Sequence, residues 1–196
     1  MILTTQMLNQ KYQDYSSPKD KIYHLVKDKK LFPIIRGIYE TDPNASPFYI
    51  ANAIYGPSYI SFNSALAYYG MIPEATYNTT CATYNLRKSR SYKNKWGTFF
   101  FNDVPKKAYP LGINTITENN NTFYMATREK ALCDQLYHIP PCQGLKHLIY
   151  TLFEDMRLDQ EQFNNLNRQD IYELADLYHC TNVRLLAQYL RRVHHE

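Results

Sequence analysis

A short stretch bounded by two prolines, Pro57 and Pro73, constrains the fold of this chain more than any other. It opens on a Gly-Pro turn signal. Ser61 is suited to the N-cap of a helix, because its hydroxyl can accept a hydrogen bond from a free backbone N–H of the first turn. Gly70 stands where a left-handed residue would end that helix, and Pro73 prevents any continuation. The stretch therefore predicts a short capped helix over 61–69, and taken alone it favours a structural role.

The first forty residues predict two helices followed by a hairpin. Thr4 or Thr5 can cap a first short helix, and Ser17-Pro18 places a capping residue before a proline at the first helical position. Apolar residues recur at helical spacing over 19–29, and the pattern of 31–39 is typical of two short strands joined by a turn. These are the parts of a winged helix-turn-helix, except that the first of its usual three helices is hard to see.

A linker rich in Pro, Asn and Ser at residues 43–47 separates this part from a larger one. Strands are expected at 75–84, 97–104, 112–117 and 122–126, with helices at 48–55, 61–69, 127–137, 143–155, 167–178 and 182–193. Residues 87–95 are expected to form a basic connection. We therefore predict an α+β fold with two domains. Residues 1–43 would form the winged helix-turn-helix. Residues 45–196 would form a mixed α/β domain with a small, mostly antiparallel sheet and C-terminal helices.

Charge is segregated along the chain. The net charge of +4 is too small to show a nucleic-acid partner, but residues 81–110 hold seven cations against Asp103 alone. Residues 1–40 hold another seven cations against four acids, whereas residues 154–176 are acidic. This distribution predicts two basic surfaces and one acidic surface.

The first basic surface has the composition of a DNA-reading helix. Lysine and arginine neutralise phosphates, and the first turn of a recognition helix reaches base edges. On this interpretation the DNA contacts are Ser17, Lys19, Tyr23, His24, Lys27, Lys30 and Arg36, the last at the tip of the wing. The alternative is a solvated basic face. The second surface consists of Arg87, Lys88, Arg90, Lys93 and Lys95, and it could meet nucleic acid or an acidic partner, or simply be solvated.

No catalytic, cofactor-binding or metal-binding set stands out. Cys133, His138 and Cys142 are near in sequence, as His179 is to Cys180, but they lack the spacing of structural zinc sites. Nuclease chemistry needs carboxylates around a metal, and the residues that could be assembled for it are Asp103, Glu118, Glu129 and Lys130. We found no secretory leader or membrane-crossing run, and the four scattered cysteines are typical of free thiols in a cytoplasmic protein.

Three blocks in a fixed order resemble the AbiEi family of antitoxins. They are Arg36-Gly37-Ile38-Tyr39, then Ser58 to Pro73, then Ala126-Thr127-Arg128-Glu129-Lys130-Ala131-Leu132-Cys133-Asp134. The resemblance implies an antitoxin of a bacterial abortive-infection, type IV toxin–antitoxin system. Its winged helix would repress the operon by binding repeats in the promoter. The second domain would counter a nucleotidyltransferase-like toxin, without need of a stable complex.

Two other classes of function stay open beside this one. The chain could be a stand-alone winged-helix regulator whose second domain senses a ligand or partner, or a nuclease of a mobile element. If the chain is an antitoxin, the basic residues between Arg87 and Lys95 are the leading candidates for the neutralising surface.

Overall fold

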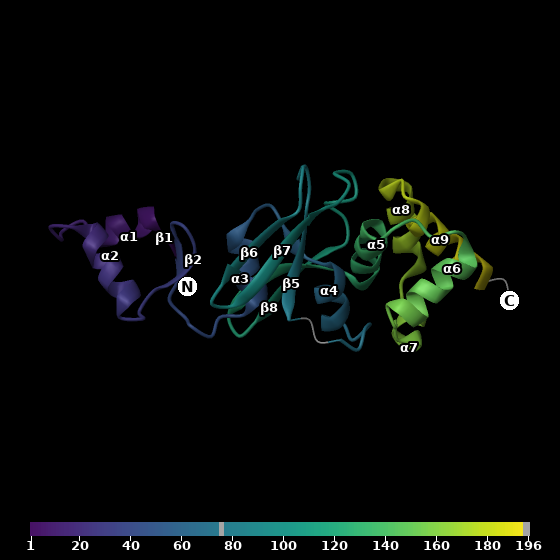
Figure 1. Ribbon diagram of the computed structural model, residues 1–196, viewed down its shortest axis with the longest axis horizontal. Coiled ribbons are helices and arrows are strands. Elements are labelled where there is room, and N and C mark those ends of the chain that lie inside the picture. The colour runs from purple at the N-terminus through teal and green to yellow at the C-terminus, as the bar shows by residue number, and fades with distance from the viewer. Residues whose placement is uncertain (75–76, 194–196) are drawn as a thin grey trace.

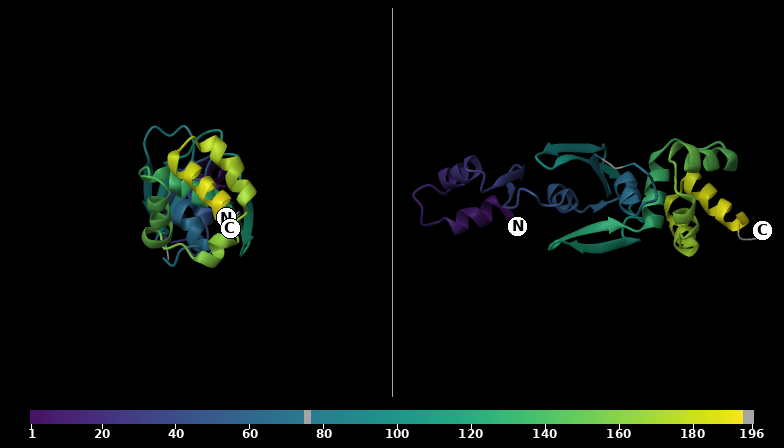
Figure 2. Two further views of the ribbon diagram at one scale, coloured as in Figure 1. Left: turned by 90° about the vertical axis from the view of Figure 1, so that its right-hand side faces the viewer. Right: turned by 90° about the horizontal axis from the view of Figure 1, so that it is seen from below.

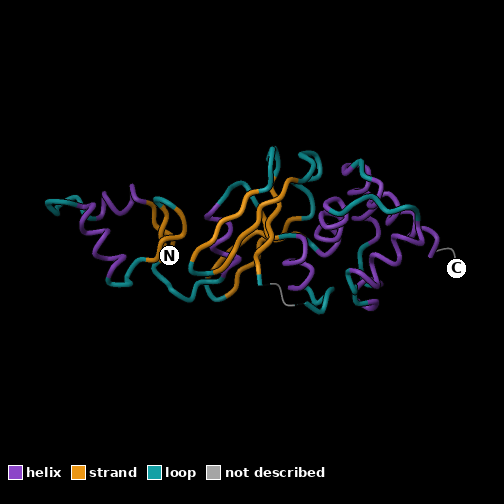
Figure 3. The backbone as a smooth tube through the Cα atoms, in the orientation of Figure 1, coloured by secondary structure: helices purple, strands orange, loops and turns teal. Residues whose placement is uncertain are grey.

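The computed structural model describes residues 1–74 and 77–193 of the chain. The molecule is elongated, with three parts in series: a small N-terminal unit, a central sheet and a C-terminal group of helices (Figure 1). The backbone trace shows strands gathered in the middle and helices alone at the C-terminal end (Figure 3). This mixed arrangement confirms the predicted α+β class.

The N-terminal unit is a three-stranded antiparallel sheet with two helices. Its elements are β1 (Ile2–Thr4), α1 (Thr5–Lys11), α2 (Pro18–Lys27), β2 (Phe32–Ile35) and β3 (Ile38–Glu40), and the strand order is β1-β3-β2. Thr4 and Ser17 cap the two helices, as predicted. A cluster of four buried residues holds the unit together: Leu3, Leu8, Ile22 and Leu31. Strand β1 was not predicted, since three residues are too few to show a period of two.

Helix α2 ends two residues earlier than predicted. Asp28 is its C-cap, and Lys29 follows in the left-handed region with φ 56°. The N–H of Lys30 donates to the carbonyl of Leu25 at 2.8 Å, which is the long hydrogen bond of a Schellman motif. Lys30 therefore lies in the turn after α2, and not on the helix.

The central part is a six-stranded sheet with two helices. Its elements are α3 (Pro47–Ile54), β4 (Tyr59–Ile60), α4 (Phe62–Tyr68), β5 (Asn78–Thr83), β6 (Arg90–Asn94), β7 (Gly97–Asp103), β8 (Ile113–Glu118) and β9 (Asn121–Ala126). The strand order is β6-β7-β5-β4-β9-β8; β4–β9 and β5–β7 are parallel, and the other three pairings are antiparallel. Seen from below, the β6–β7 ribbon and the β8–β9 hairpin splay apart, with α3 between them (Figure 2).

Helix α4 has the predicted position but not the predicted N-cap contact. Gly70 has φ 67° and the N–H of Met71 donates to the carbonyl of Leu66 at 2.8 Å, so the helix ends in a Schellman motif as expected. Ser61 occupies the N-cap position but makes no capping hydrogen bond. Its hydroxyl donates to Asp134 instead, at 2.6 Å. The hydrogen bond that a hydroxyl donates to a charged carboxylate is stronger than the one that it accepts from a neutral backbone N–H.

The central part differs from the prediction at β6, and the range predicted for β5 extends past the described residues. Residues 87–95 were expected to be a connection, but they include the edge strand β6, which pairs with β7 from Arg90 to Asn94. The sequence gives little sign of this strand, because no residue of β6 is buried on either face and the strand therefore shows no hydrophobic alternation. The strand predicted over 75–84 is present as β5, and residues 75 and 76 lie outside the described part of the chain.

The C-terminal group packs onto the sheet through α5. Its elements are α5 (Arg128–His138), α6 (Leu145–Tyr150), a π-helical turn (Thr151–Asp155), α7 (Gln160–Asn164), α8 (Arg168–Tyr178) and α9 (Thr181–Val193). Thr127 and Asn167 cap α5 and α8, which were predicted to begin at these residues, and Thr181 is the first helical residue of α9. Helix α7 was not predicted, because five residues carry too little periodicity.

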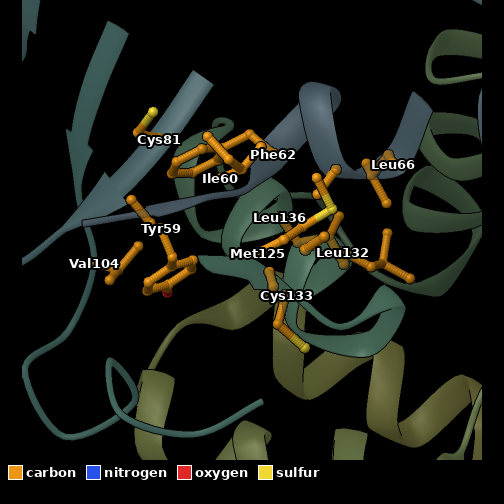
Figure 4. Close-up of a cluster of buried hydrophobic side chains, with 14 of the residues drawn as sticks. Tyr59, Ile60, Phe62, Leu66, Cys81, Val104, Met125, Leu132, Cys133 and Leu136 are labelled. Atoms are coloured by element: carbon orange, nitrogen blue, oxygen red, sulfur yellow. The ribbon is translucent and has the colours of Figure 1, made fainter. Parts of the chain in front are cut away.

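One continuous core joins the sheet to the C-terminal helices. Tyr59 from β4 points into the same core as Met125 from β9 and Leu132 and Leu136 from α5 (Figure 4). Leu66 on α4 belongs to it as well. Burial of this apolar surface, at about 25 cal/mol per Å², is the main force that holds sheet and helices together.

The N-terminal unit also contacts the central part. Ile34 of β2 belongs to the main core, and its carbonyl accepts a hydrogen bond from the Asn94 side chain at 3.2 Å. The rings of Phe32 and Trp96 meet edge to face, with centroids 6.4 Å apart. Independent folding of residues 1–43 and 45–196 stays a prediction. Within the described residues, no helix has both the length and the apolar character needed to cross a membrane.

Candidate functional site

Helix α2 presents one basic and aromatic face to solvent. Lys19, Tyr23 and Lys27 are four residues apart, so they lie above one another on the same face. All three are exposed, and Tyr23 has 65% of its surface accessible. The ring of His24 meets that of Tyr23 at 5.7 Å. An exposed tyrosine between two lysines is an arrangement suited to a phosphate backbone with bases beside it.

The β2–β3 turn lies beside this face. Arg36 is exposed at the turn, and Gly37 has φ 85°, a conformation that favours glycine. The carbonyl of Gly37 accepts a hydrogen bond from the N–H of Thr5 at 2.9 Å, which ties the turn to the start of α1. Lys19, Tyr23 and Arg36 line one hollow of about 420 Å³ between α2 and the hairpin.

The structure thus brings together most of the residues predicted to contact DNA. Lys19, Tyr23 and Arg36 share the hollow, and Lys27 continues the face along α2. Ser17 is half-buried, and its hydroxyl oxygen accepts the N–H of Asp20 at 3.4 Å as the helix cap. Among the described residues, no carboxylate lies within ion-pair distance of the four cations of this surface: Lys19, Lys27, Lys30 and Arg36.

The second predicted surface lies on and before the edge strand β6. Arg87 and Lys88 are in the loop after β5, and Arg90 begins β6. Together with Tyr55 they line a hollow of about 490 Å³. The Arg90 guanidinium stands over the Tyr55 ring, 5.2 Å from its centroid. Lys93 is exposed further along β6, and Lys95 stands 4.1 Å from the centroid of Phe32 in the N-terminal unit.

A buried polar network, which sequence reasoning missed, lies at the junction of sheet and helices. Lys130 and Asp134 lie one turn apart on α5, with Nζ and Oδ1 separated by 3.4 Å and both side chains inaccessible to solvent. The hydroxyls of Tyr59 and Ser61 donate to Asp134 Oδ2 at 3.0 and 2.6 Å. The hydroxyl of Tyr178 donates to Asp134 Oδ1.

The buried ammonium group of Lys130 has three polar partners. Its Nζ donates to the carbonyl of Ala108 at 2.8 Å and to the hydroxyl of Tyr178 at 2.6 Å, and it forms an ion pair with Asp134. A buried charge is tolerated only when it is paired and hydrogen-bonded in this way. Neither charged group reaches solvent, and the network connects β4, α5 and α8.

The network makes the fold sensitive to alkali. Burial and the nearby Asp134 carboxylate raise the pKa of Tyr59 and of Tyr178 well above 10. Their protonated forms therefore stabilise the folded chain fully below about pH 10, where unfolded tyrosine titrates, and this stability is lost as pH rises toward the folded pKa. We expect the free energy of unfolding to fall above pH 10, with each of these tyrosines contributing a slope of up to about 1.4 kcal/mol per pH unit.

Urea unfolding at pH 8, 10, 10.5 and 11 measures this slope. Tyr178→Phe should flatten it, because the variant removes one of the two groups. Tyr150→Phe is the matched control, since Tyr150 is 58% exposed. Equal slopes for the parent chain and Tyr178→Phe above pH 10 would contradict the assignment.

The residues considered for nuclease chemistry each have a separate structural partner. Asp103 accepts the N–H of Leu86 at 2.7 Å, and Glu129 accepts the N–H of Asn167 at 2.8 Å. Lys130 belongs to the buried network. Glu118 accepts a hydrogen bond from the Tyr68 hydroxyl. Glu129, in the first turn of α5, thus contacts the N-terminus of α8. In the described ranges, no group of three or more His, Cys, Asp or Glu side chains is placed to hold a metal ion.

The four cysteines are free thiols, as expected. Cys81 and Cys133 are buried within the core, and burial raises the pKa of both thiols. Thiolate formation is therefore suppressed, and these residues act as small apolar side chains.

A signal for the buried network was present in the sequence. Tyr59 and Ser61 stand in one of the three blocks that resemble AbiEi antitoxins, and Lys130 and Asp134 stand in another. Only the fold shows that the two blocks meet. Comparison with known proteins adds nothing to this resemblance: no family model matches the chain, and no curated protein matches it either.

Proposed function

We propose that this chain is an AbiEi-like antitoxin that also represses its own operon through promoter DNA. On this proposal the N-terminal unit is a winged helix-turn-helix, with α2 as its recognition helix and the β2–β3 turn as a short wing. The observation that carries it is the shared hollow of Lys19, Tyr23 and Arg36 between α2 and the hairpin.

The topology of the unit supports this proposal. Two consecutive helices are followed by a hairpin, and β1 completes an antiparallel sheet in the order β1-β3-β2. A recognition helix fits the major groove while a wing contacts the adjacent backbone. The residues proposed to touch DNA through α2 and its flanks are Ser17, Lys19, Tyr23, His24, Lys27, Lys30 and Arg36.

Binding of the full chain to its own promoter tests the DNA role. We expect salt-sensitive binding of a labelled duplex that carries the upstream region of the gene. Each lost phosphate contact should reduce the slope of log K against log salt by roughly 0.9, so a Lys19/Lys27/Arg36 triple alanine variant should lose up to about 2.7 of that slope. Tyr23→Ala should weaken binding to the promoter more than to unrelated DNA, since Tyr23 is placed among the groove contacts.

The matched control is a Lys106/Lys107 double alanine variant. Both lysines are exposed, and they lie in the turn after β7, away from α2. This control should bind the promoter like the parent chain. Unchanged promoter binding by the Lys19/Lys27/Arg36 variant would remove the winged helix from the proposal.

The antitoxin role is supported by the resemblance and by the network that unites two of its blocks. Its partner would be a nucleotidyltransferase-like toxin, and the candidate neutralising surface is the basic patch of Arg87, Lys88, Arg90, Lys93 and Lys95. Co-expression with the product of the neighbouring gene tests it, scored as rescue of growth. Rescue by the parent chain supports the antitoxin; absence of rescue contradicts it.

One observation favours a ligand-sensing regulator as the second candidate function. The hollow beside the π-helical turn has a volume of about 500 Å³, within the range of small-molecule sites. Polar side chains that line it include Asn63, Gln135, His147 and Thr151. Promoter binding without growth rescue is the result that would favour this alternative.

A further inference from the structure

The hollow before β6 combines exposed cations with an aromatic side wall. Arg87, Lys88 and Arg90 are exposed on its rim, and Tyr55 forms one side. The Tyr55 ring is half-buried and its other contacts hold it in place: its centroid lies 5.5 Å from that of Phe101. The guanidinium of Arg90 lies above the ring.

The backbone of this hollow is also fixed. Asn85 adopts the left-handed region with φ 60°, a conformation that asparagine tolerates better than most residues. The next N–H, that of Leu86, donates to Asp103 Oδ1 at 2.7 Å. This hydrogen bond satisfies a carboxylate oxygen of Asp103 and directs it at the backbone. In the described part of the chain no carboxylate forms an ion pair with the three rim cations.

We propose that this hollow binds single-stranded nucleic acid, with phosphates on Arg87, Lys88 and the outer N–H groups of Arg90. A base would stack on the guanidinium plane of Arg90, which the Tyr55 ring supports from below. Cations that track a backbone, together with a flat aromatic or guanidinium surface that takes a base, are the two parts of single-strand recognition. A volume of about 490 Å³ accommodates one nucleotide. A duplex keeps its bases stacked inside the helix. Its phosphates could therefore contact the rim cations, but its bases could not stack in the hollow beside Tyr55.

The inference rests on the proposal that the basic patch is a working surface of this chain. It differs from the promoter site, which lies on α2. It also needs no toxin in its test, so failure of binding and failure of growth rescue are separate results.

A binding titration with a short RNA tests the inference. The probe is a fluorescein-labelled 12-nucleotide RNA of mixed A and U, measured by anisotropy with the full chain. Replacing Arg87, Lys88 and Arg90 together by Ser should weaken binding at least tenfold at 100 mM salt. It should also reduce the salt slope by roughly 2, which is three phosphate contacts at about 0.7 each on a single strand. These side chains are exposed, so the variant keeps the core intact.

Two further variants separate stacking from charge. Tyr55→Leu should weaken RNA binding roughly 5- to 100-fold with the salt slope unchanged, whereas Tyr55→Phe should bind like the parent chain. Thermal melts of both variants confirm that they are folded. Replacing Lys106 and Lys107 by Ser is the charge control, and this variant should bind RNA like the parent chain.

Competitors distinguish the chemistry of the partner. A single-stranded DNA of the same sequence that competes as well as RNA would show that the 2′-hydroxyl is not read, which still supports the proposal. Poly-glutamate that competes as well as RNA, together with an unaffected Tyr55→Leu variant, would overturn it in favour of an acidic protein surface. Unchanged RNA affinity in the Arg87/Lys88/Arg90 variant would overturn it as well.

Discussion

Replacing Lys130 by Met is expected to lower the free energy of unfolding by about 3–5 kcal/mol. The variant leaves Asp134 buried with its hydroxyl donors but without the cation that balances its charge. For a chain of 196 residues this corresponds to a fall in melting temperature of roughly 6–20 °C, at about 2–4 °C per kcal/mol. Urea unfolding and calorimetry of the variant against the parent chain measure the effect.

Two comparisons identify the cause of that loss. Lys146→Met on α6 removes an exposed lysine of the same size and should change stability by less than about 0.5 kcal/mol. A Lys130→Met/Asp134→Asn double variant removes both charges, so it should be more stable than Lys130→Met alone. A double variant that is no more stable than Lys130→Met would show that the uncompensated charge is not the source of the loss.

Replacing Gly112 by Ala is expected to lower the free energy of unfolding by about 2–5 kcal/mol. Gly112 has φ 65°, where a Cβ costs about 1–2 kcal/mol. A Cβ at this position would also lie 2.8 Å from Lys130 Cβ and 3.3 Å from Thr127 Oγ1. Lys130 Cβ is held by the α5 backbone, so the contact cannot be relieved by rotation of a side chain, and overpacking adds about 1–3 kcal/mol.

Gly70→Ala is the matched control for this prediction. Gly70 has φ 67°, nearly the same backbone conformation, but nothing lies within 4 Å of the position of its Cβ. We expect the free energy of unfolding to fall by about 1–2 kcal/mol, because only the strain of a Cβ in the left-handed backbone conformation contributes. Equal losses at the two glycines would show that the close approach of Gly112 to Lys130 does not limit packing there.

The sequence by itself determined the local elements with strong signals. Ser17-Pro18, Thr127 and Asn167 marked helix starts, and the Gly70 position marked a helix end, because capping is chemistry within one turn. The order of the predicted helices and strands gave the class of fold, and the lysines of residues 19–27 gave the basic character of α2. The short elements β1, β4 and α7 were missed because so few residues carry no readable period. The equally short β2 and β3 were predicted, since a turn signal lies between them.

Only the tertiary structure decided where the chemically distinctive side chains act. Ser61 has the sequence context of a helix cap, but its hydroxyl turns to Asp134, which is 73 residues away. Lys130 has the sequence context of an exposed charge in a first helical turn, yet it is buried against Tyr178 and the carbonyl of Ala108. Contacts between residues so distant in sequence depend on how β4, α5 and α8 pack. Local propensity contains no information about that packing, because it arises from burial of apolar surface by the whole chain.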